Sequence, residues 1–265
     1  MLRLFLTPEE EAFLYSDNHH GDPASVLLIG AGALGCAAAR TLAAAARGIG
    51  AGLGLTLVDS DRVEVSNLQR QVLYRDSDIG RLKVEAAAER LRADFDFTAA
   101  AKALHLDAAN GPALMAAHDI VIDGTDDPQT KFLLSRLCVE AGVPLVHGGV
   151  VRTGGQWMLI EPRVSACLAC VFPEVPPSGN EGCAALGILA PVAGVVGSMQ
   201  AITALRRLFQ PARARAGRLY IYELGGVRLR HVDFPPNPQC HCGTRDDRSV
   251  DRAQSAQSFP RRQAS

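Results

Sequence analysis

The sequence predicts an α/β fold with a doubly wound, largely parallel sheet and antiparallel C-terminal strands. Three observations support this prediction. A continuously apolar segment near the start of the chain leads into a glycine-rich turn and an alanine-rich helix. Apolar strands and helices then alternate, as parallel βαβ units require, and a hairpin follows the last long helix. Because hairpins join antiparallel strands, the parallel part of the sheet should end before that hairpin.

The first unit has the order of a Rossmann-like nucleotide-binding motif. An apolar strand at 25–30 precedes the turn Gly30-Ala31-Gly32-Ala33-Leu34-Gly35, a helix to about residue 47, and a second strand at 54–59. Strand, glycine turn, helix, strand and acid follow one another as in a dinucleotide-binding unit. A glycine turn without a ligand is the structural alternative.

Each polar or flexible position of this unit has an expected role. Gly30 permits the tight turn, Gly32 lets the backbone approach a phosphate, and Gly35 lets the helix pack closely on the strand. Asp59, at the end of the second strand, is placed to accept hydrogen bonds from a ribose. The turn does not select the nucleotide, because NAD, FAD, SAM and ATP proteins can all carry it.

The rest of the chain continues the alternation. Asp127 before Pro128 predicts a helix N-cap, and Gly142 predicts the end of that helix. We expect helices at about 82–93, 108–117, 128–141 and 188–208, and strands at about 97–104, 119–123, 144–151, 155–161, 218–223 and 227–233.

Composition sets the domain organisation and excludes some functions. We expect an N-terminal arm at 1–23, one nucleotide-binding domain at 24–243 with a loop at 162–187, and a disordered polar tail at 244–265. The net charge of -1 gives no basic face for DNA and no attraction to anionic membranes. The apolar run at 188–204 is short for a membrane span and predicts a buried core helix. Without a secretory signal, the expected compartment is the cytoplasm.

The residues after Asp59 indicate which chemistry the nucleotide serves. Asn67, Arg70 and Lys83 gather two cations and an amide beyond the ribose-binding acid. Such a cluster suits a triphosphate, because charge developing on phosphorus needs fixed cations nearby. An NAD-dependent oxidoreductase, the alternative from another functional class, gives no reason for these three residues together.

The chain resembles the MoeB/ThiF/HesA family, the bacterial branch of the ubiquitin-activating-enzyme superfamily. The most specific string is Ser66-Asn67-Leu68-Gln69-Arg70-Gln71. The resemblance covers about 24–243, through the segments 30–35, 57–61, 66–71, 80–86, 123–127, 144–149, 167–173 and 187–201.

The resemblance implies an ATP-dependent adenylyltransferase. Such enzymes join AMP to the C-terminal carboxylate of a ubiquitin-fold sulfur-carrier protein ending in Gly-Gly, and release pyrophosphate. The product then serves sulfur transfer in molybdopterin, thiamin or related biosynthesis. A homodimer is implied, although residues 1–23 hold only Arg3 as a candidate arginine for a partner's site. The alternatives are adenylation of a peptide or tRNA carboxylate, and an inactive carrier-binding scaffold.

Matching positions imply roles in this chain. Asp59 would bind the ribose, and Asn67 and Arg70 the phosphates. Lys83 would neutralise charge around the α-phosphate. Asp126 would hold Mg²⁺ or orient the α-phosphate region, since hard oxygen ligands suit Mg²⁺. Asp127 stands where the family usually has Asn, which leaves its contact with the nucleotide in question.

The chain has seven cysteines, and four of them form two close pairs. Cys167 with Cys170 and Cys240 with Cys242 have a pattern typical of a structural zinc site. The family usually has Cys-x-x-Cys at the second pair, so His241 is a possible substitute ligand here. A lost site or a redox pair are the alternatives.

Cys183 lies in the loop at 162–187, where some relatives use a cysteine to take the activated carrier or its sulfur. A thiolate there could attack the adenylate. A passive thiol is the alternative. Cys36 and Cys138 lie on expected helices and are predicted to be small core residues.

Overall fold

The computed structural model describes residues 23–49, 52–175 and 187–243 of the chain. Their strands form one eight-stranded sheet in the order β3-β2-β1-β4-β5-β6-β7-β8. The strands are β1 (Ala24–Ile29), β2 (Leu53–Val58), β3 (Ala99–Lys102), β4 (Ile120–Asp123), β5 (Leu145–Val151), β6 (Gly154–Ile160), β7 (Arg218–Glu223) and β8 (Arg228–Asp233). The α-helices are α2 (Ala33–Ile49), α3 (Lys83–Phe95), α4 (Gly111–Ala116), α5 (Pro128–Ala141), α6 (Leu168–Val171) and α8 (Ala190–Phe209).

The sheet topology confirms the expected fold class. β1 pairs in parallel with β2 and β4, and the parallel ladders continue to β3 on one side and β5 on the other. β5, β6, β7 and β8 follow one another as antiparallel neighbours. The chain starts in the middle of the sheet and winds outward both ways, so a topological switch point lies between β1 and β4. Ligands of open α/β sheets bind at the carboxyl ends of the strands at such a point.

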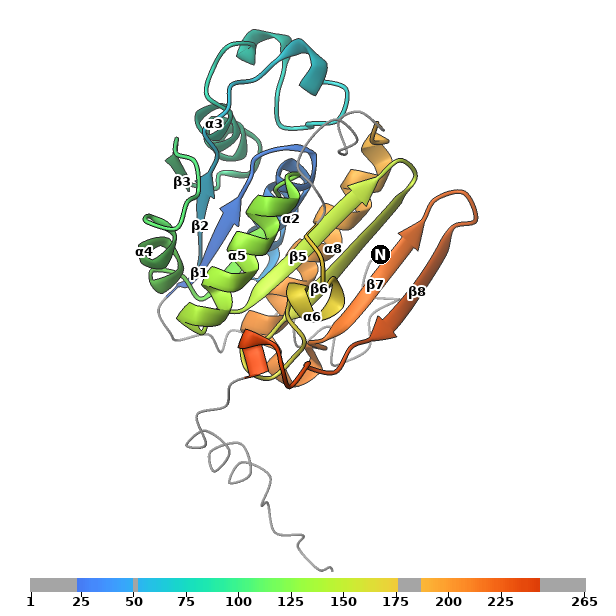
Figure 1. Ribbon diagram of the computed structural model, residues 1–265. Coiled ribbons are helices and arrows are strands. Elements are labelled where there is room, and N and C mark those ends of the chain that lie inside the picture. The colour runs from blue at the N-terminus through green and yellow to red at the C-terminus, as the bar shows by residue number, and fades with distance from the viewer. Residues whose placement is uncertain (1–22, 50–51, 176–186, 244–265) are drawn as a thin grey trace, which may run out of the picture.

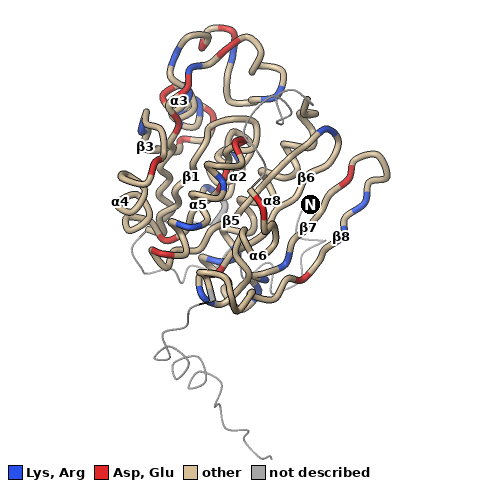
Figure 2. Tube along the Cα trace, in the orientation of Figure 1, with Lys and Arg blue, Asp and Glu red and all other residues tan. Residues whose placement is uncertain are grey.

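Helices cover both faces of the sheet, as Figure 1 shows. One buried apolar cluster lies on the face that carries α2, α3 and α8, and a second lies under α4, α5 and α6. The predicted core helix is confirmed, because α8 packs against α2 and against β4, β5 and β6. None of the described helices is long and apolar enough to cross a bilayer. Acidic and basic positions are interspersed along the trace in Figure 2.

The expected elements form, with two differences. The strand predicted at 97–104 is shorter, at Ala99–Lys102, because only these four residues pair with β2. The region predicted as a continuous loop contains the one-turn helix α6, which begins after Cys167 and ends before Phe172. A single turn is too short to show helical periodicity in a sequence. The arm at 1–22, Cys183 and the tail from 244 lie outside the described residues.

Candidate active site

A cavity of about 310 Å³ opens at the carboxyl ends of β1, β2 and β4, beside the end of β5. Its position is the switch point of the sheet. Most of the residues predicted to bind a nucleotide line it together: Gly30, Gly32, Asp59, Arg70, Lys83, Asp126 and Asp127. The sequence segments that carry them are far apart in the chain, so the fold assembles the site.

The glycine turn is fixed by close backbone contacts. Gly30 has a φ of +90°, and a Cβ there would lie 2.7 Å from the carbonyl of Gly124. A Cβ on Gly35 would lie 1.9 Å from the oxygen of Gly30, so Gly35 has the packing role predicted for it and lies behind the cavity wall. At Gly32 the nearest protein atom to a Cβ would be Nε2 of Gln71, 3.9 Å away. Gly32 therefore leaves room on the cavity side, where we predict a phosphate.

The carboxylate of Asp59 is held by two backbone amides. Oδ2 accepts a hydrogen bond of 2.7 Å from the Ala31 N–H, and Oδ1 accepts one of 2.8 Å from the Asp61 N–H. These bonds fix the acid beside the glycine turn. Each oxygen retains acceptor capacity toward the cavity, as its predicted ribose-binding role requires.

Two predicted phosphate-binding cations lie on the cavity wall. Lys83 begins α3, its side chain is 9% exposed, and its Nζ donates to Oδ2 of Asp61 at 2.8 Å. Asp61 is 65% exposed and lines the same cavity. Arg70 donates from Nη1 to the Ser66 carbonyl at 2.8 Å. The structure thus brings both cations to the wall of one cavity.

Asn67 is the predicted ligand whose side chain has another position. Its Oδ1 accepts from the Glu64 N–H at 3.1 Å, and its Nδ2 donates to Oγ of Ser66 at 3.3 Å. It is buried, and it is absent from the cavity wall. Asn67 therefore stabilises the turn that leads to Arg70 in this structure, and its contact with a phosphate stays a prediction.

Gln71 is a cavity residue to which sequence reasoning gave no role. It is buried on the cavity wall, and its Oε1 has no hydrogen-bond partner among the described residues. The Nε2 of Gln71, which is the donor that a phosphate would need, lies 3.9 Å from the position of a Cβ on Gly32. The sequence offered a signal for Gln71, because it is the last residue of the family-specific string that contains Arg70.

Asp127 has the capping role that the sequence suggested, and Asp126 lies at the cavity, where its predicted role requires it. Asp127 is the N-cap of α5: its Oδ2 accepts 2.8 Å bonds from the Thr130 N–H and from the Thr130 hydroxyl. Asp126 is exposed at the cavity and makes no hydrogen bond or ion pair with the part of the chain that is described. A carboxylate so placed fits a hard cation such as Mg²⁺.

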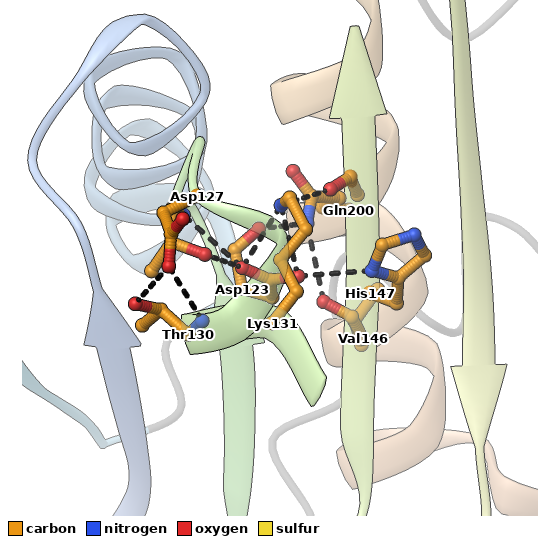
Figure 3. Close-up of polar contacts among 9 residues, drawn as sticks. Asp123, Asp127, Thr130, Lys131, Val146, His147 and Gln200 are labelled. Carbon is orange, nitrogen blue, oxygen red and sulfur yellow. Dashed lines mark hydrogen bonds and ion pairs between the residues drawn. The ribbon is translucent and has the colours of Figure 1, made fainter. Parts of the chain in front are cut away.

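A buried charge cluster borders the cavity, with Lys131 in the wall itself, and sequence reasoning missed it. Figure 3 shows Asp123 at the end of β4 between Lys131 of α5 and His147 of β5. Lys131 Nζ lies 3.1 Å from Oδ2 of Asp123, and His147 Nδ1 lies 2.9 Å from the same oxygen. These residues come from three elements, so neither spacing nor periodicity joins them in the sequence.

The protonation states of the cluster follow from burial and charge. Burial alone would raise the pKa of Asp123, but Lys131, His147 and Thr125 lower it by more, and the net pKa lies below that of an ordinary carboxyl group. Burial lowers the pKa of His147 despite the nearby carboxylate. The imidazole is therefore neutral at neutral pH, and its Nδ1–H donates to Asp123.

The four paired cysteines converge although the second pair has only one residue between its members. Sγ of Cys167 lies 3.5 Å from Sγ of Cys240, and Sγ of Cys170 lies 3.3 Å from Sγ of Cys242. All four sulfur atoms lie within 4.8 Å of one another. Zinc held by four thiolates requires sulfur–sulfur distances of about 3.8 Å, so the donor set fits a metal.

Two of the three remaining cysteines lie in the core, and the third lies outside the described residues. Cys36 and Cys138 are buried, as expected, and burial raises the pKa of Cys36 to about 12. His241 approaches Cys240 at 3.5 Å but does not belong to the group of four. Cys183, the predicted nucleophile, lies outside the described residues.

Comparison with known proteins places the chain in a family. It matches the ThiF family over residues 21–243. The SAMP-activating enzyme E1 of Haloferax volcanii is 38% identical over 221 residues, which cover 82% of this chain and 80% of that protein. The adenylyltransferase and sulfurtransferase uba4 of Aspergillus fumigatus is 43% identical over 200 residues, covering 71% of this chain and 39% of the relative. The chain thus spans about two-fifths of the uba4 protein.

Solved structures share the fold. The crystal structure of E. coli MccB with ATP has a TM-score of 0.70 at 20% identity, covering 84% of this chain and 67% of that one. The family match, the relative from Haloferax volcanii and the cavity residues agree with one another. The chain therefore belongs to the ThiF family and is an E1-like adenylyltransferase, as its motifs predict.

Proposed function

We propose that this enzyme uses ATP to adenylate the C-terminal Gly-Gly carboxylate of a small ubiquitin-fold sulfur-carrier protein. The observation that carries the proposal is the convergence of Arg70, Lys83 and Asp126 on the cavity that the glycine turn closes. The names of two relatives, a SAMP-activating E1 and uba4, support a carrier protein as the partner. The product would enter sulfur transfer for molybdopterin, thiamin or a related compound.

The side chains of the cavity suit this reaction. One carboxylate oxygen of the carrier attacks the α-phosphorus of ATP, the bond from that phosphorus to the bridging oxygen breaks, and pyrophosphate leaves. Asp59 orients the ribose, and Arg70 and the Nε2 donor of Gln71, which lies near Gly32, hold the β- and γ-phosphates. Lys83 stabilises negative charge that develops on the α-phosphate, which fixed cations do best in a preorganised site. Asp126 would hold Mg²⁺, which supplies charge neutralisation when bound.

Three further features belong to the proposal. Cys167, Cys170, Cys240 and Cys242 hold structural zinc, supported by the convergence of their sulfur atoms. Four protein ligands leave no open position, so the zinc would stabilise the fold without joining the chemistry. The enzyme acts in the cytoplasm, and it acts as a homodimer, which its resemblance to the MoeB/ThiF/HesA group implies.

ATP–pyrophosphate exchange tests the proposed function. We expect purified enzyme to exchange labelled pyrophosphate into ATP only when it is given a ubiquitin-fold carrier with an intact Gly-Gly end. The matched control is the same carrier without its last two glycines, which should give no exchange. Arg70→Ala should lower the rate by about 100-fold, because it removes one preorganised cation.

Two results would count against the proposal. No exchange with any Gly-Gly carrier would refute the carrier as substrate, and exchange with a free peptide or with tRNA would assign another carboxylate. Undiminished exchange by Arg70→Ala would remove Arg70 from the site. Carrier binding without any exchange would support the inactive scaffold.

A further inference from the structure

β4 and β5, whose ends lie beside the cavity, are joined by a short stretch of backbone pairing. β4 and β5 pair through only two residue pairs, Val121 with Leu145 and Ile122 with Val146. Beyond these pairs no ladder joins the two strands. The chain after β4 lines the cavity with Thr125 and Asp126, and the end of β5 lines it with Gly149 and Val150. We call these two lining segments the Asp126 wall and the Gly149 wall. Because β4 and β5 share only those two pairs, contacts between side chains also help to hold these two walls relative to each other.

Lys131 joins the two walls. Its ammonium lies 3.2 Å and 3.1 Å from the two carboxylate oxygens of Asp123, and it donates to the carbonyl of Gly148 at 2.6 Å. Asp123 ends β4, and Gly148 precedes Gly149 in β5. Lys131 lies on the cavity wall itself. The Lys131 side chain thus links the ends of β4 and β5 beyond their backbone ladder.

The same carboxylate fixes the residue before Asp126. Oδ1 of Asp123 accepts a 3.1 Å bond from the Thr125 N–H and a 2.7 Å bond from the Thr125 hydroxyl. Asp123 is 0% exposed, so its charge must be compensated within the protein. Movement of Lys131 would therefore disturb Asp123, Thr125 and Asp126 in turn.

Two neutral side chains, those of His147 and Gln200, also hold Asp123 in place, as Figure 3 shows. His147 donates to the carboxylate of Asp123 from β5. From the opposite face, Gln200 of α8 donates its Nε2 to the carbonyls of Asp123 and Val146, at 2.7 Å and 3.1 Å. These bonds also cross from β4 to β5, but they carry no compensating charge. Lys131 is the cation that faces Asp123 within the described structure.

The residue type suits this position. The chain is rich in arginine, and its lysines are Lys83, Lys102 and Lys131. A compact ammonium directs three donors to acceptors around a point, whereas the planar guanidinium of arginine is wider and presents its donors as a fork. The three acceptor atoms around Lys131 surround a single nitrogen.

We propose that Lys131 is a positioning residue for adenylation: it holds the Asp126 wall and the Gly149 wall at the separation that lets a carboxylate reach the α-phosphate. Lys131 acts through Asp123 and Gly148 and leaves nucleotide binding to the glycine turn and Asp59. The inference rests on the proposed function. It predicts an effect on the rate of the chemical step and little effect on ATP binding.

The test removes the bridge without leaving a buried charge. In the double variant Asp123→Asn/Lys131→Met both charges disappear while the side-chain shapes are nearly kept. We expect kcat for ATP–pyrophosphate exchange to fall by about 100-fold, because small misplacements of reacting groups cost that much, while KM for ATP changes by less than about threefold. Lys131→Arg keeps the charge, should fold even if the double variant does not, and should lose about tenfold in kcat. Lys102→Met, at an exposed residue of β3, is the matched control and should keep parental kinetics.

Amide hydrogen exchange gives a reading that does not depend on turnover. In both Lys131 variants the amides of 124–126 and 148–151 should exchange faster than in the parent, with the rest of the sheet unchanged. Parental kcat in both variants, or a raised KM with an unchanged kcat, would overturn the proposal. If the parent activates no carrier, the proposed function fails, but the amide exchange measurement still tests the role of Lys131. Unchanged protection of the amides of 124–126 and 148–151 in both variants would overturn that role.

Discussion

Two adjacent carboxylates before α5 differ in their surroundings and therefore in their expected roles. Asp127 accepts two hydrogen bonds from Thr130 and caps the helix. Asp126 is exposed at the cavity, and the described residues offer it no partner. One is satisfied by its own chain, and the other remains available to a ligand.

Alanine substitution should separate these roles. Asp127→Ala should lower the free energy of unfolding by about 1 kcal/mol, because the helix loses its N-cap. Asp126→Ala should change that free energy by less than about 0.5 kcal/mol. It should also reduce carrier-dependent ATP–pyrophosphate exchange by on the order of 100-fold. Urea unfolding and exchange assays on both variants give the comparison, and a stable, fully active Asp126→Ala would contradict the assignment.

Single polar residues were the least predictable part of the site. Arg70 and Lys83 lie on the cavity wall as their motif indicates, but Asn67, from the same motif, turns inward to bond Glu64 and Ser66. A motif specifies which residues are present, whereas local hydrogen bonds decide where each side chain points. The contact between His147 and Asp123 had no sequence signal, because the two residues lie on different strands.

Among the elements, the glycine turn has the strictest steric requirement. A Cβ on Gly35 would overlap the carbonyl oxygen of Gly30, so helix α2 can approach the turn only without a side chain there. Gly194, on α8, contrasts with it, since a Cβ there would meet no atom within 4 Å. Substituting each glycine by alanine tests whether ATP binding and stability require tight packing at the turn, or only depend on glycine being present.

Gly35→Ala should displace the turn and weaken ATP binding by about 100-fold, with a loss of about 2 kcal/mol or more in stability. Gly194→Ala should stabilise the protein by about 0.5–1 kcal/mol, because alanine is the better helix former. Calorimetric ATP titration and thermal unfolding measure both effects. Parental ATP affinity in Gly35→Ala would show that the turn tolerates a side chain and would refute the steric argument.

Elements with clear periodicity were predicted well. The helix from Pro128 to Ala141 starts at the predicted cap and ends at Gly142 in the left-handed conformation. The one-turn helix α6 was not predicted, because four residues show no period and tertiary contacts keep it in place. Leu168, for example, is buried and donates its N–H to the Ser135 hydroxyl.

At the scale of the whole molecule, the cysteine cluster ties distant parts of the chain together. Cys167 and Cys240 are 73 residues apart, and Cys170 and Cys242 are 72 apart. The cluster links α6 to the last described residues, beyond β8. A metal in it would cross-link the C-terminal end to the face of the sheet that carries α5.

Metal analysis should find one zinc ion per chain in the parent. Cys240→Ser and Cys242→Ser should lose the metal and lower Tm by about 5 °C or more, because metal-binding free energy contributes to folding. His241→Ala is the matched control and should retain zinc, since four thiols already form the set. Zinc retained by both serine variants, or lost by His241→Ala, would assign the ligands differently.

The sequence by itself determined the fold class, the nucleotide-binding turn and the family, because these depend on local patterns: apolar runs, a glycine spacing and one specific polar string. Only the tertiary structure decided which side chains meet. It brought Arg70, Lys83 and Asp126 to one cavity, turned Asn67 away from it, and enclosed Asp123 between Lys131 and His147. The physical reason is that contacts between strands and helices far apart in the chain depend on sheet order and register, which no local pattern specifies.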